Sequence, residues 1–348
     1  MNHSAQSSQE LSASLRLEIE AELKSIFKTN AEFQWENLPG DASNRRYVRV
    51  RHQDETRILM IMNAPEAFKS EEKTQNLQSE NSEELDYVRV TKAWQSHGIR
   101  VPRIDAIGSA NDFLILEDFG QELLFDRRQN QAAIEFYKKS IEELIKIQRL
   151  PLEFPFKKSA FTEELFRWEL HHFFEYAIEK RDVKLSSSEA ALLHQSFDRW
   201  AKYLGGLPQV VSHRDYHSKN LMILKDRDGT EEIGVIDFQD ALSGPIVYDL
   251  ASLLRDSYVR LSDQEEAELF AFFSERAERM FSYEDFCLQS IQRNLKAVGR
   301  FFYISIVKKR DTHLPYVKPS MARIVKSLEQ IDEIPLMQLL QAKLGDLF

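Results

Sequence analysis

The residues best suited to chemistry lie in one short segment, where a histidine, an aspartate and an asparagine stand at fixed spacing. After His213, Arg214 and Asp215, four residues intervene before Asn220, which fits the pattern H-R-D-x-x-x-x-N. Phosphoryl transfer needs a carboxylate that accepts a hydrogen bond from the attacking hydroxyl, and an oxygen ligand for the metal that bridges the phosphates. The spacing therefore predicts Asp215 as the catalytic base and the Asn220 amide as a Mg²⁺ ligand.

A second acidic position follows a predicted β-hairpin. The apolar runs 221–224 and 233–236 flank a turn that contains Asp228 and Gly229, which is a hairpin signal. Asp237 comes directly after the second run, where a phosphotransferase with this catalytic loop places its main metal-binding carboxylate. We predict Asp237 as the second Mg²⁺ ligand.

Two other interpretations of the segment stay open. His213 and His217 are four residues apart, so on a helix they could share a zinc ion, but Arg214 occupies the place of the glutamate that H-E-x-x-H requires, and a strand follows. The segment could also be a loop of polar residues with a purely structural role.

A turn of small residues in the N-terminal part could close over phosphates. Backbone N–H groups of such a turn bind phosphate oxygens, and two adjacent arginines add positive charge. Near residue 118, an extended segment could present its backbone to an adenine edge. No G-x-x-x-x-G-K-[ST] is present, which argues against a P-loop kinase. The nucleotide-binding residues predicted on these grounds are Gly40, Asp41, Ala42, Ser43, Arg45, Arg46, Glu117 and Phe119.

Composition narrows the class of protein. The chain has 348 residues, 43% of them hydrophobic, and a formal net charge of -10, which argues against a nucleic-acid binder. The single cysteine, Cys287, excludes an intramolecular disulfide. The first 14 residues are polar and lack the apolar run of a signal peptide, and no apolar stretch is long enough to cross a bilayer. We expect a monomeric cytoplasmic protein that binds neither nucleic acid nor membrane.

Periodicity predicts an α+β architecture of two lobes. Residues 1–14 are predicted to be a disordered tail, 15–118 a nucleotide-binding lobe, and 119–348 a mainly helical lobe with the catalytic loop and the substrate pocket. The first lobe is expected to hold a small antiparallel sheet, from the strand-like runs 33–38, 46–51, 57–62, 103–108 and 113–117, with helices at 15–27 and 83–97. From residue 131 onward the pattern is helical except around the hairpin.

With these segments in view, the chain resembles the aminoglycoside-phosphotransferase/choline-kinase superfamily, and more narrowly the bacterial anomeric kinases for N-acetylmuramate and N-acetylglucosamine of cell-wall sugar recycling. The resemblance implies a protein-kinase-like fold, ATP as phosphate donor, Mg²⁺ and a small amino-sugar acceptor. The segments that carry it are 40–47, 62–66, 113–120, 213–222, 235–258 and 292–299.

The resemblance also assigns supporting residues. Asp249 would brace the catalytic loop, or else only act on the helix dipole, and His213 and His217 would support the loop. Strand 57–62 has no interior lysine, so Arg45 or Arg46 would contact the phosphates, and the partner glutamate would be Glu80, Glu83 or Glu84. Residues considered for contact with the substrate are Glu169, Arg255, Lys296 and Arg300.

The sequence thus predicts an ATP-dependent sugar 1-kinase. The alternatives are a kinase of another small alcohol, such as an aminoglycoside, choline or homoserine, and a nucleotide-binding regulatory pseudokinase. The intact Asp215, Asn220 and Asp237 argue against the pseudokinase. A peptide kinase is disfavoured because no A-P-E activation segment follows Asp237.

Overall fold

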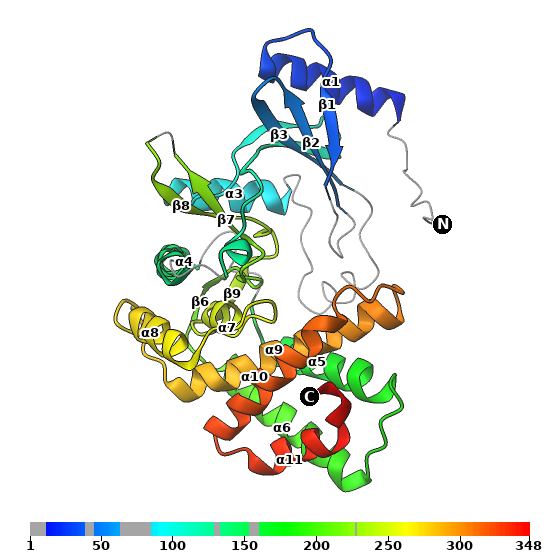
Figure 1. The fold of residues 1–348 in the computed structure, drawn as a ribbon, viewed down its shortest axis with the longest axis vertical. Helices are drawn as coiled ribbons and strands as arrows, with labels where there is room; N and C mark the ends of the chain where they lie inside the picture. The colour runs from blue at the N-terminus through cyan, green and yellow to red at the C-terminus, as the bar shows by residue number, and fades with distance from the viewer. Residues whose placement is uncertain (1–11, 39–44, 63–84, 129–132, 153–159, 227) are drawn as a thin grey trace. The chain divides into compact units, whose positions relative to one another are not determined.

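The computed structural model describes residues 12–38, 45–62, 85–128, 133–152, 160–226 and 228–348. These form two compact units (Figure 1). The first holds the described residues up to 62 together with Pro102–Asp118, and the second holds residues 85–101 together with Phe119–Phe348.

The first unit is an antiparallel sheet with one helix on its face. The strand order is β1-β2-β3-β5-β4, and the inward side chains of the strands pack against Ile19 and Leu23 of the helix. Val48 and Val50 alternate with arginines along β2, whereas β3 carries a continuous apolar run, Ile58 to Ile61, whose last three residues are buried. The predicted strands and helix are confirmed as α1 (Ala13–Phe27), β1 (Gln34–Asn37), β2 (Arg46–His52), β3 (Glu55–Ile61), β4 (Ile104–Ile107) and β5 (Phe113–Glu117).

A buried ion pair closes the end of this sheet. Arg49 on β2 donates from Nε and Nη2 to the two carboxylate oxygens of Asp118, at 2.6 and 3.1 Å. Both side chains are almost fully buried, so removal of either would deprive a buried charge of a close, bidentate partner. The pair thus joins β2 to Asp118, the residue that follows β5.

The second unit is mainly helical, with two small antiparallel ladders. The predicted hairpin is confirmed, since Leu221 pairs with Val235 and Lys225 with Glu231. A second ladder, which the sequence did not predict, joins β6 to β9 and places Ser212 opposite Leu242. The strands are β6 (Gln209–Ser212), β7 (Leu221–Lys225), β8 (Glu231–Val235) and β9 (Leu242–Pro245). The α-helices are α3 (Asp86–Ser96), α4 (Ala133–Gln148), α5 (Glu163–Phe173), α6 (Ser187–Gly205), α7 (Tyr248–Leu254), α8 (Asp263–Ser274), α9 (Tyr283–Ile306), α10 (Val317–Gln330) and α11 (Ile334–Lys343).

Short helical turns complete the unit. They are the 3₁₀ turns η1 (Leu124–Arg127), η3 (Leu314–Tyr316) and η4 (Gly345–Leu347), and the π-helical turn η2 (Phe174–Glu179), which continues α5.

Helix α9 is the centre of the helical packing. It contacts α5, α6, α7 and α10, and Figure 1 shows it running between these elements. Ser282 caps its first turn by accepting a hydrogen bond from the Asp285 amide, and the Asp285 carboxylate accepts from the Ser282 amide in return. The long helix therefore has a defined start, and nearly all of its faces are covered.

The helix predicted at 83–97 packs with the second unit, whereas the sequence placed it in the first lobe. Trp94 of α3 is fully buried, and its ring lies 5.3 Å from the ring of Phe238. Tyr87 lies 4.8 Å from the same ring. The helix thus packs on the segment that follows the hairpin.

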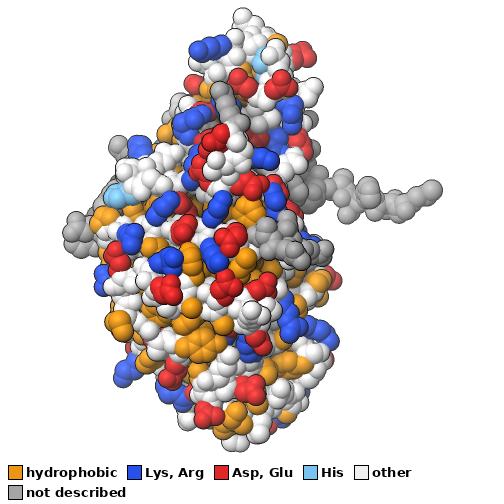
Figure 2. Space-filling view, turned by 60° about the vertical axis from the view of Figure 1, so that its left-hand side comes forward, with side chains coloured by type: hydrophobic (Ala, Val, Ile, Leu, Met, Phe, Trp, Pro, Cys, Tyr) orange, Lys and Arg blue, Asp and Glu red, His pale blue; other side chains and the backbone are white. Residues whose placement is uncertain are grey.

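None of the helices formed by the described residues is both long enough and apolar enough to cross a membrane. On the face shown in Figure 2, acidic and basic side chains are interspersed.

We predict that Gly299→Ala destabilises the second unit. A Cβ at Gly299 would lie 2.8 Å from the backbone N and Cα of Phe173, so α5 and α9 would have to move apart. Overpacking of this kind costs about 1–3 kcal/mol. Urea unfolding should show the loss, while Gly345→Ala, where no atom lies within 4 Å, should behave as wild type. Equal midpoints for Gly299→Ala and wild type would contradict this close approach.

Candidate active site

Asp249 holds the start of the catalytic loop. Its Oδ2 accepts a hydrogen bond from the His213 amide at 2.7 Å, and its Oδ1 accepts from the Arg214 amide at 2.9 Å. Burial raises the pKa of Asp249 to about 6, although the two amides act in the opposite direction. Near neutral pH, the carboxylate therefore satisfies two buried N–H groups for which no strand offers a partner.

His213 is held as a neutral imidazole. Its Nε2 lies 2.9 Å from the carbonyl oxygen of Ile236, and its Nδ1 accepts from the Asp215 amide at 3.3 Å. Because a carbonyl requires a donor and an amide an acceptor, the tautomer with a proton on Nε2 fits both contacts. Burial lowers the pKa of His213 to about 4. Both nitrogens are in use, so this residue offers no lone pair to zinc.

Two residues of the site have left-handed backbone conformations. Arg214 has φ +80° and Asp237 has φ +62°, values that residues other than glycine seldom adopt. Such conformations cost about 1–3 kcal/mol and persist where the surroundings impose them. At Arg214 the surrounding constraint is the bond to Asp249.

Cations surround Asp215. One carboxylate oxygen accepts from Nη2 of Arg293 on α9 at 3.1 Å, and the side chain keeps 38% of its surface exposed. Burial acts to raise the pKa of Asp215, but the charges of Lys296 and Arg293 outweigh it and hold the pKa well below its ordinary value. Asp215 is thus ionised and oriented, with its other oxygen available to an acceptor.

A buried glutamate holds this cationic group together. Glu169 of α5 is fully buried and accepts from Lys296 at 2.8 Å, from Gln292 at 2.7 Å and from Arg214 at 3.4 Å. Sequence reasoning proposed Glu169 for the substrate, whereas the structure shows it bound to the catalytic loop and to α9.

Whether this site suits Mg²⁺ depends on the oxygen atoms that Asn220 and Asp237 present. Asn220 donates from Nδ2 to the carbonyl oxygen of Asp215 at 2.9 Å, so its amide oxygen is the atom turned to a ligand. Asp237 is exposed, and Gln239 donates to its Oδ1 at 2.7 Å. An amide oxygen and a carboxylate, completed by phosphate oxygens and water, form a donor set that suits Mg²⁺. Within the described part of the chain, no group of three or more His, Cys, Asp or Glu side chains is placed to hold a metal.

One residue predicted to contact the substrate, Arg255, has its own partners in the second unit. Arg255 is 1% exposed and donates to Glu266, Tyr283, Ser327 and Gln330, so its guanidinium is already engaged inside the helical unit. We therefore leave it out of the site.

Several nucleotide candidates have contacts within their own units. Arg46 donates to Asn37 at 2.7 Å, and Glu117 accepts from the Arg103 amide at 3.2 Å. The ring of Phe119 lies under the Arg100 guanidinium at 4.6 Å. Arg45 precedes β2 and is partly exposed. Gly40, Asp41, Ala42 and Ser43, with Glu80, Glu83 and Glu84, lie outside the described residues.

Further contacts anchor the end of the predicted catalytic loop. Ser218 donates from its amide to Asp256 at 3.0 Å. Lys219 lies over the Tyr258 ring at 3.9 Å and donates to the Tyr316 hydroxyl at 3.3 Å. The His217 ring meets the edge of Tyr258 at 5.1 Å. Sequence reasoning missed these anchors and Arg293, although the spacing of Arg293, Lys296 and Arg300 by three and four residues was a signal for one helical face.

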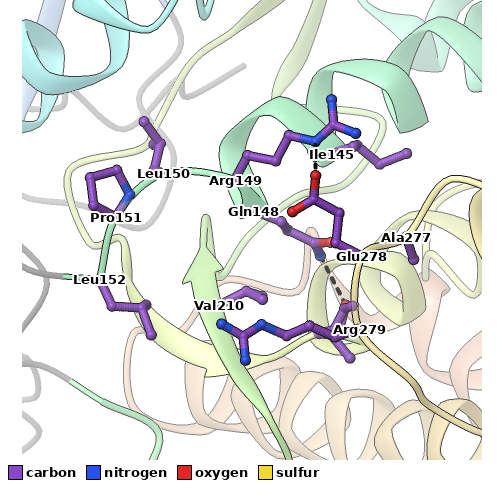
Figure 3. A pocket seen from close by; sticks show the side chains of 11 residues that line it. Ile145, Gln148, Arg149, Leu150, Pro151, Leu152, Val210, Ala277, Glu278 and Arg279 are labelled. Carbon is purple, nitrogen blue, oxygen red and sulfur yellow. Dashed lines mark hydrogen bonds and ion pairs between the residues drawn. The ribbon is translucent and has the colours of Figure 1, made fainter.

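A cavity of about 400 Å³ lies elsewhere in the second unit (Figure 3). Gln148 donates to the Ile246 carbonyl at its wall, and Arg149 pairs with Glu278 at 2.8 Å. None of the predicted site residues lines it, so we do not assign the reaction to it. Its lining residues are Ile145, Gln148, Arg149, Leu150, Pro151, Leu152, Val210, Ile246, Ala277, Glu278 and Arg279.

Comparison with known proteins places this geometry in context. The profile described as "Phosphotransferase enzyme family" matches residues 34–282. A relative from Pseudomonas aeruginosa named N-acetylmuramate/N-acetylglucosamine kinase is 30% identical over 75% of this chain and 74% of its own. A relative of the same name from Pseudomonas putida is 29% identical over 81% of both chains. The structure of choline kinase LicA from Streptococcus pneumoniae, at 14% identity, covers 90% of this chain and 99% of its own with a TM-score of 0.59. This last likeness shows the shared fold alone, and with it the predicted protein-kinase-like architecture is confirmed.

The buried His213 gives a testable pH dependence. An unfolded histidine has a pKa near 6.5, so between pH 6.5 and about 4 the unfolded chain binds a proton that folded His213 does not. Folding stability linked to His213 is thus present above pH 6.5 and is lost as the pH falls to 4, by about 3 kcal/mol.

His213→Gln removes this linkage, although it also weakens the loop. The difference in unfolding free energy between wild type and His213→Gln should shrink by about 2–3 kcal/mol from pH 7 to pH 4.5 in urea titrations. A difference that stays constant over this range would contradict the burial of a neutral imidazole.

Proposed function

The chain belongs to the phosphotransferase enzyme family, and from this premise we propose that it is an ATP-dependent sugar 1-kinase. The acceptor is the anomeric hydroxyl of N-acetylmuramate or N-acetylglucosamine, and the product is the sugar 1-phosphate that cell-wall recycling in the cytoplasm would use. The names of four relatives at 26–30% identity support this acceptor. The observation that carries the reaction is Asp215, held by the braced loop and partly exposed.

Asp215 acts on the acceptor. The hydroxyl donates to the carboxylate oxygen that Arg293 does not hold, and its own oxygen attacks the γ-phosphorus. A new O–P bond forms, the bond to the leaving ADP oxygen breaks, and the hydroxyl proton passes to Asp215. Because its pKa is low, Asp215 accepts the proton only late, when the acceptor oxygen has lost charge to phosphorus. The anomeric hydroxyl suits such a weak base, since the ring oxygen makes it more acidic than an ordinary alcohol.

Asn220 and Asp237 would hold Mg²⁺, which neutralises charge on the donor phosphates when it is bound. The amide oxygen of Asn220 and the exposed carboxylate of Asp237 are the atoms for this role. His213 and Asp249 position the loop and do not touch the reactants. The nucleotide contacts of Gly40, Asp41, Ala42 and Ser43, and of Arg45, Arg46, Glu117 and Phe119, stay predictions.

The charges around Asp215 argue against the other acceptors. Choline and aminoglycosides are cations, and they would meet Arg293 and Lys296 beside the base. Like charges at this distance repel in a partly buried site. A neutral or anionic sugar avoids the repulsion.

The position of the phosphate tests the proposal. Incubation with ATP, Mg²⁺ and either sugar should give a 1-phosphate, identified by phosphorus and proton NMR. Asp215→Asn keeps the shape but loses the base, and it should lower kcat by at least about 10²-fold with little change in nucleotide affinity. A 6-phosphate, or turnover with non-sugar alcohols alone, would refute the acceptor. Near-normal turnover by Asp215→Asn would refute the catalytic role.

The metal ligands predict a graded effect on nucleotide binding. Asp237→Ala should weaken the Mg²⁺-dependent binding of ATP more than Asn220→Ala, because it removes a charged ligand. Asp240→Ala is the matched control, since Asp240 lies three residues further along the same loop. Titration of ATP with and without Mg²⁺ measures each effect. If Asp240→Ala instead abolishes the metal dependence, the ligand has been assigned to the wrong carboxylate.

A further inference from the structure

Between its first and last turns, helix α9 has one solvent-facing window, and it consists of cations. The helix is described along its whole length, and between 285 and 304 every residue is buried except Arg293, Lys296 and Arg300. Their spacing of three and four residues puts them on one face. We call these three residues the α9 strip. At a rise of 1.5 Å per residue, the strip extends about 10 Å along the helix.

The strip begins at the catalytic base. Arg293 contacts Asp215 at 3.1 Å, and its Nε donates to Ser252 at 3.1 Å. Lys296 lies one turn further on, 17% exposed, and bonds Glu169 and the Tyr248 hydroxyl. If the hydroxyl of a ligand lies at Asp215, the other substituents of a sugar ring are therefore long enough to reach the rest of the strip.

The field along the strip is positive. Lys296 shares the single carboxylate of Glu169 with Arg214. Burial lowers the pKa of Lys296 to about 8, and repulsion by Arg214 and Arg293 acts in the same direction against the attraction of Glu169. Burial, with the charges of Arg300 and Lys296, also lowers the pKa of nearby His172 to about 3. An anionic group would relieve this mutual repulsion.

Aromatic rings lie beside the far end of the strip. The Arg300 guanidinium is 4.8 Å from the Tyr303 ring, which packs at 5.2 Å against Tyr176. His172 lies between Tyr176 and Trp168, with ring distances of 4.7 and 5.7 Å. Trp168 and His172 are on α5, Tyr176 is on η2, and Arg300 and Tyr303 are on α9; Figure 1 shows α5 and α9 lying side by side. Aromatic walls with a few charged groups are typical of small-molecule sites.

We infer that the α9 strip is a specificity determinant that receives a carboxylate of the acceptor, so that an acidic amino sugar is preferred to its neutral counterpart. The inference rests on the proposed function, because it places the acceptor hydroxyl at Asp215. The same cations could instead serve an anion from another source, the phosphoryl group in transfer. Only the first role depends on the charge of the acceptor, so the two can be separated by experiment.

The test compares three acceptors of similar shape: N-acetylmuramate, its neutral methyl ester, and N-acetylglucosamine. Wild type should favour N-acetylmuramate over the ester in kcat/KM by about tenfold or more, the usual effect of a charge-assisted hydrogen bond. Lys296→Met and Arg300→Gln should each reduce this ratio several-fold. Lys202→Met, an exposed lysine on α6, should leave the ratio as in wild type. Circular dichroism and thermal melts check that the variants fold. If Lys296→Met does not fold, Arg300→Gln tests the inference.

Equal losses with all three acceptors would assign the strip to the phosphoryl group and overturn the inference. A wild-type ratio near one would overturn it as well. Calorimetric binding of N-acetylmuramate and its ester without nucleotide separates the inference from the proposed function. If neither sugar is phosphorylated but the acid binds more tightly, and loses this advantage in the variants, the kinase assignment fails while the carboxylate site stands. If the acid and the ester bind equally, the site itself is refuted.

Discussion

The backbone amides of His213 and Arg214 donate to the two oxygens of one buried carboxylate, Asp249, and the geometry of the catalytic loop follows from these two bonds. The β6–β9 ladder makes them feasible, because β9 runs back along β6, from the pair Ser212–Leu242 to the pair Gln209–Pro245, and α7 begins three residues later. With the amides held, Arg214 adopts its left-handed conformation and Asp215 emerges toward solvent. A carboxylate suits this brace because each of its two oxygens accepts one of the bonds.

Charge is the second organising feature of this region. Asp215 and Glu169 are carboxylates from different elements, and both meet cations of α9. Their negative charges make it feasible to bury Arg293 and Lys296 next to each other, and the cations in turn keep Asp215 ionised. The catalytic loop and α9 are thus bound to one another through ion pairs that neither element could form alone. Glu169 is fully buried, and it both links α5 to Arg214 and Lys296 and compensates their positive charge.

Local sequence pattern was sufficient for the parts of the site that lie close together along the chain. The spacing of His213, Asp215 and Asn220 predicted a loop, and the apolar runs on either side of Asp228 and Gly229 predicted the hairpin that leads to Asp237. These inferences succeed because a tight turn and a two-stranded ladder depend on neighbouring residues. The sheet of the first unit followed from short strand-like runs separated by turn residues, and the helices predicted at 15–27 and 83–97 agree with α1 and α3 within a few residues.

Contacts between distant segments depended on tertiary packing. Arg255, Arg293 and Arg300 are chemically the same in the sequence, yet Arg255 is engaged with Glu266 inside the helical unit while Arg293 reaches Asp215, 78 residues away in the chain. The β6–β9 ladder and the packing of α3 on Phe238 are equally long-range. By itself the sequence predicted the candidate reactive residues, and it determined most of the elements that carry them. Only the folded chain decided which cation reaches Asp215, because that depends on how the helices pack. The type of a side chain does not specify which distant residue it will contact.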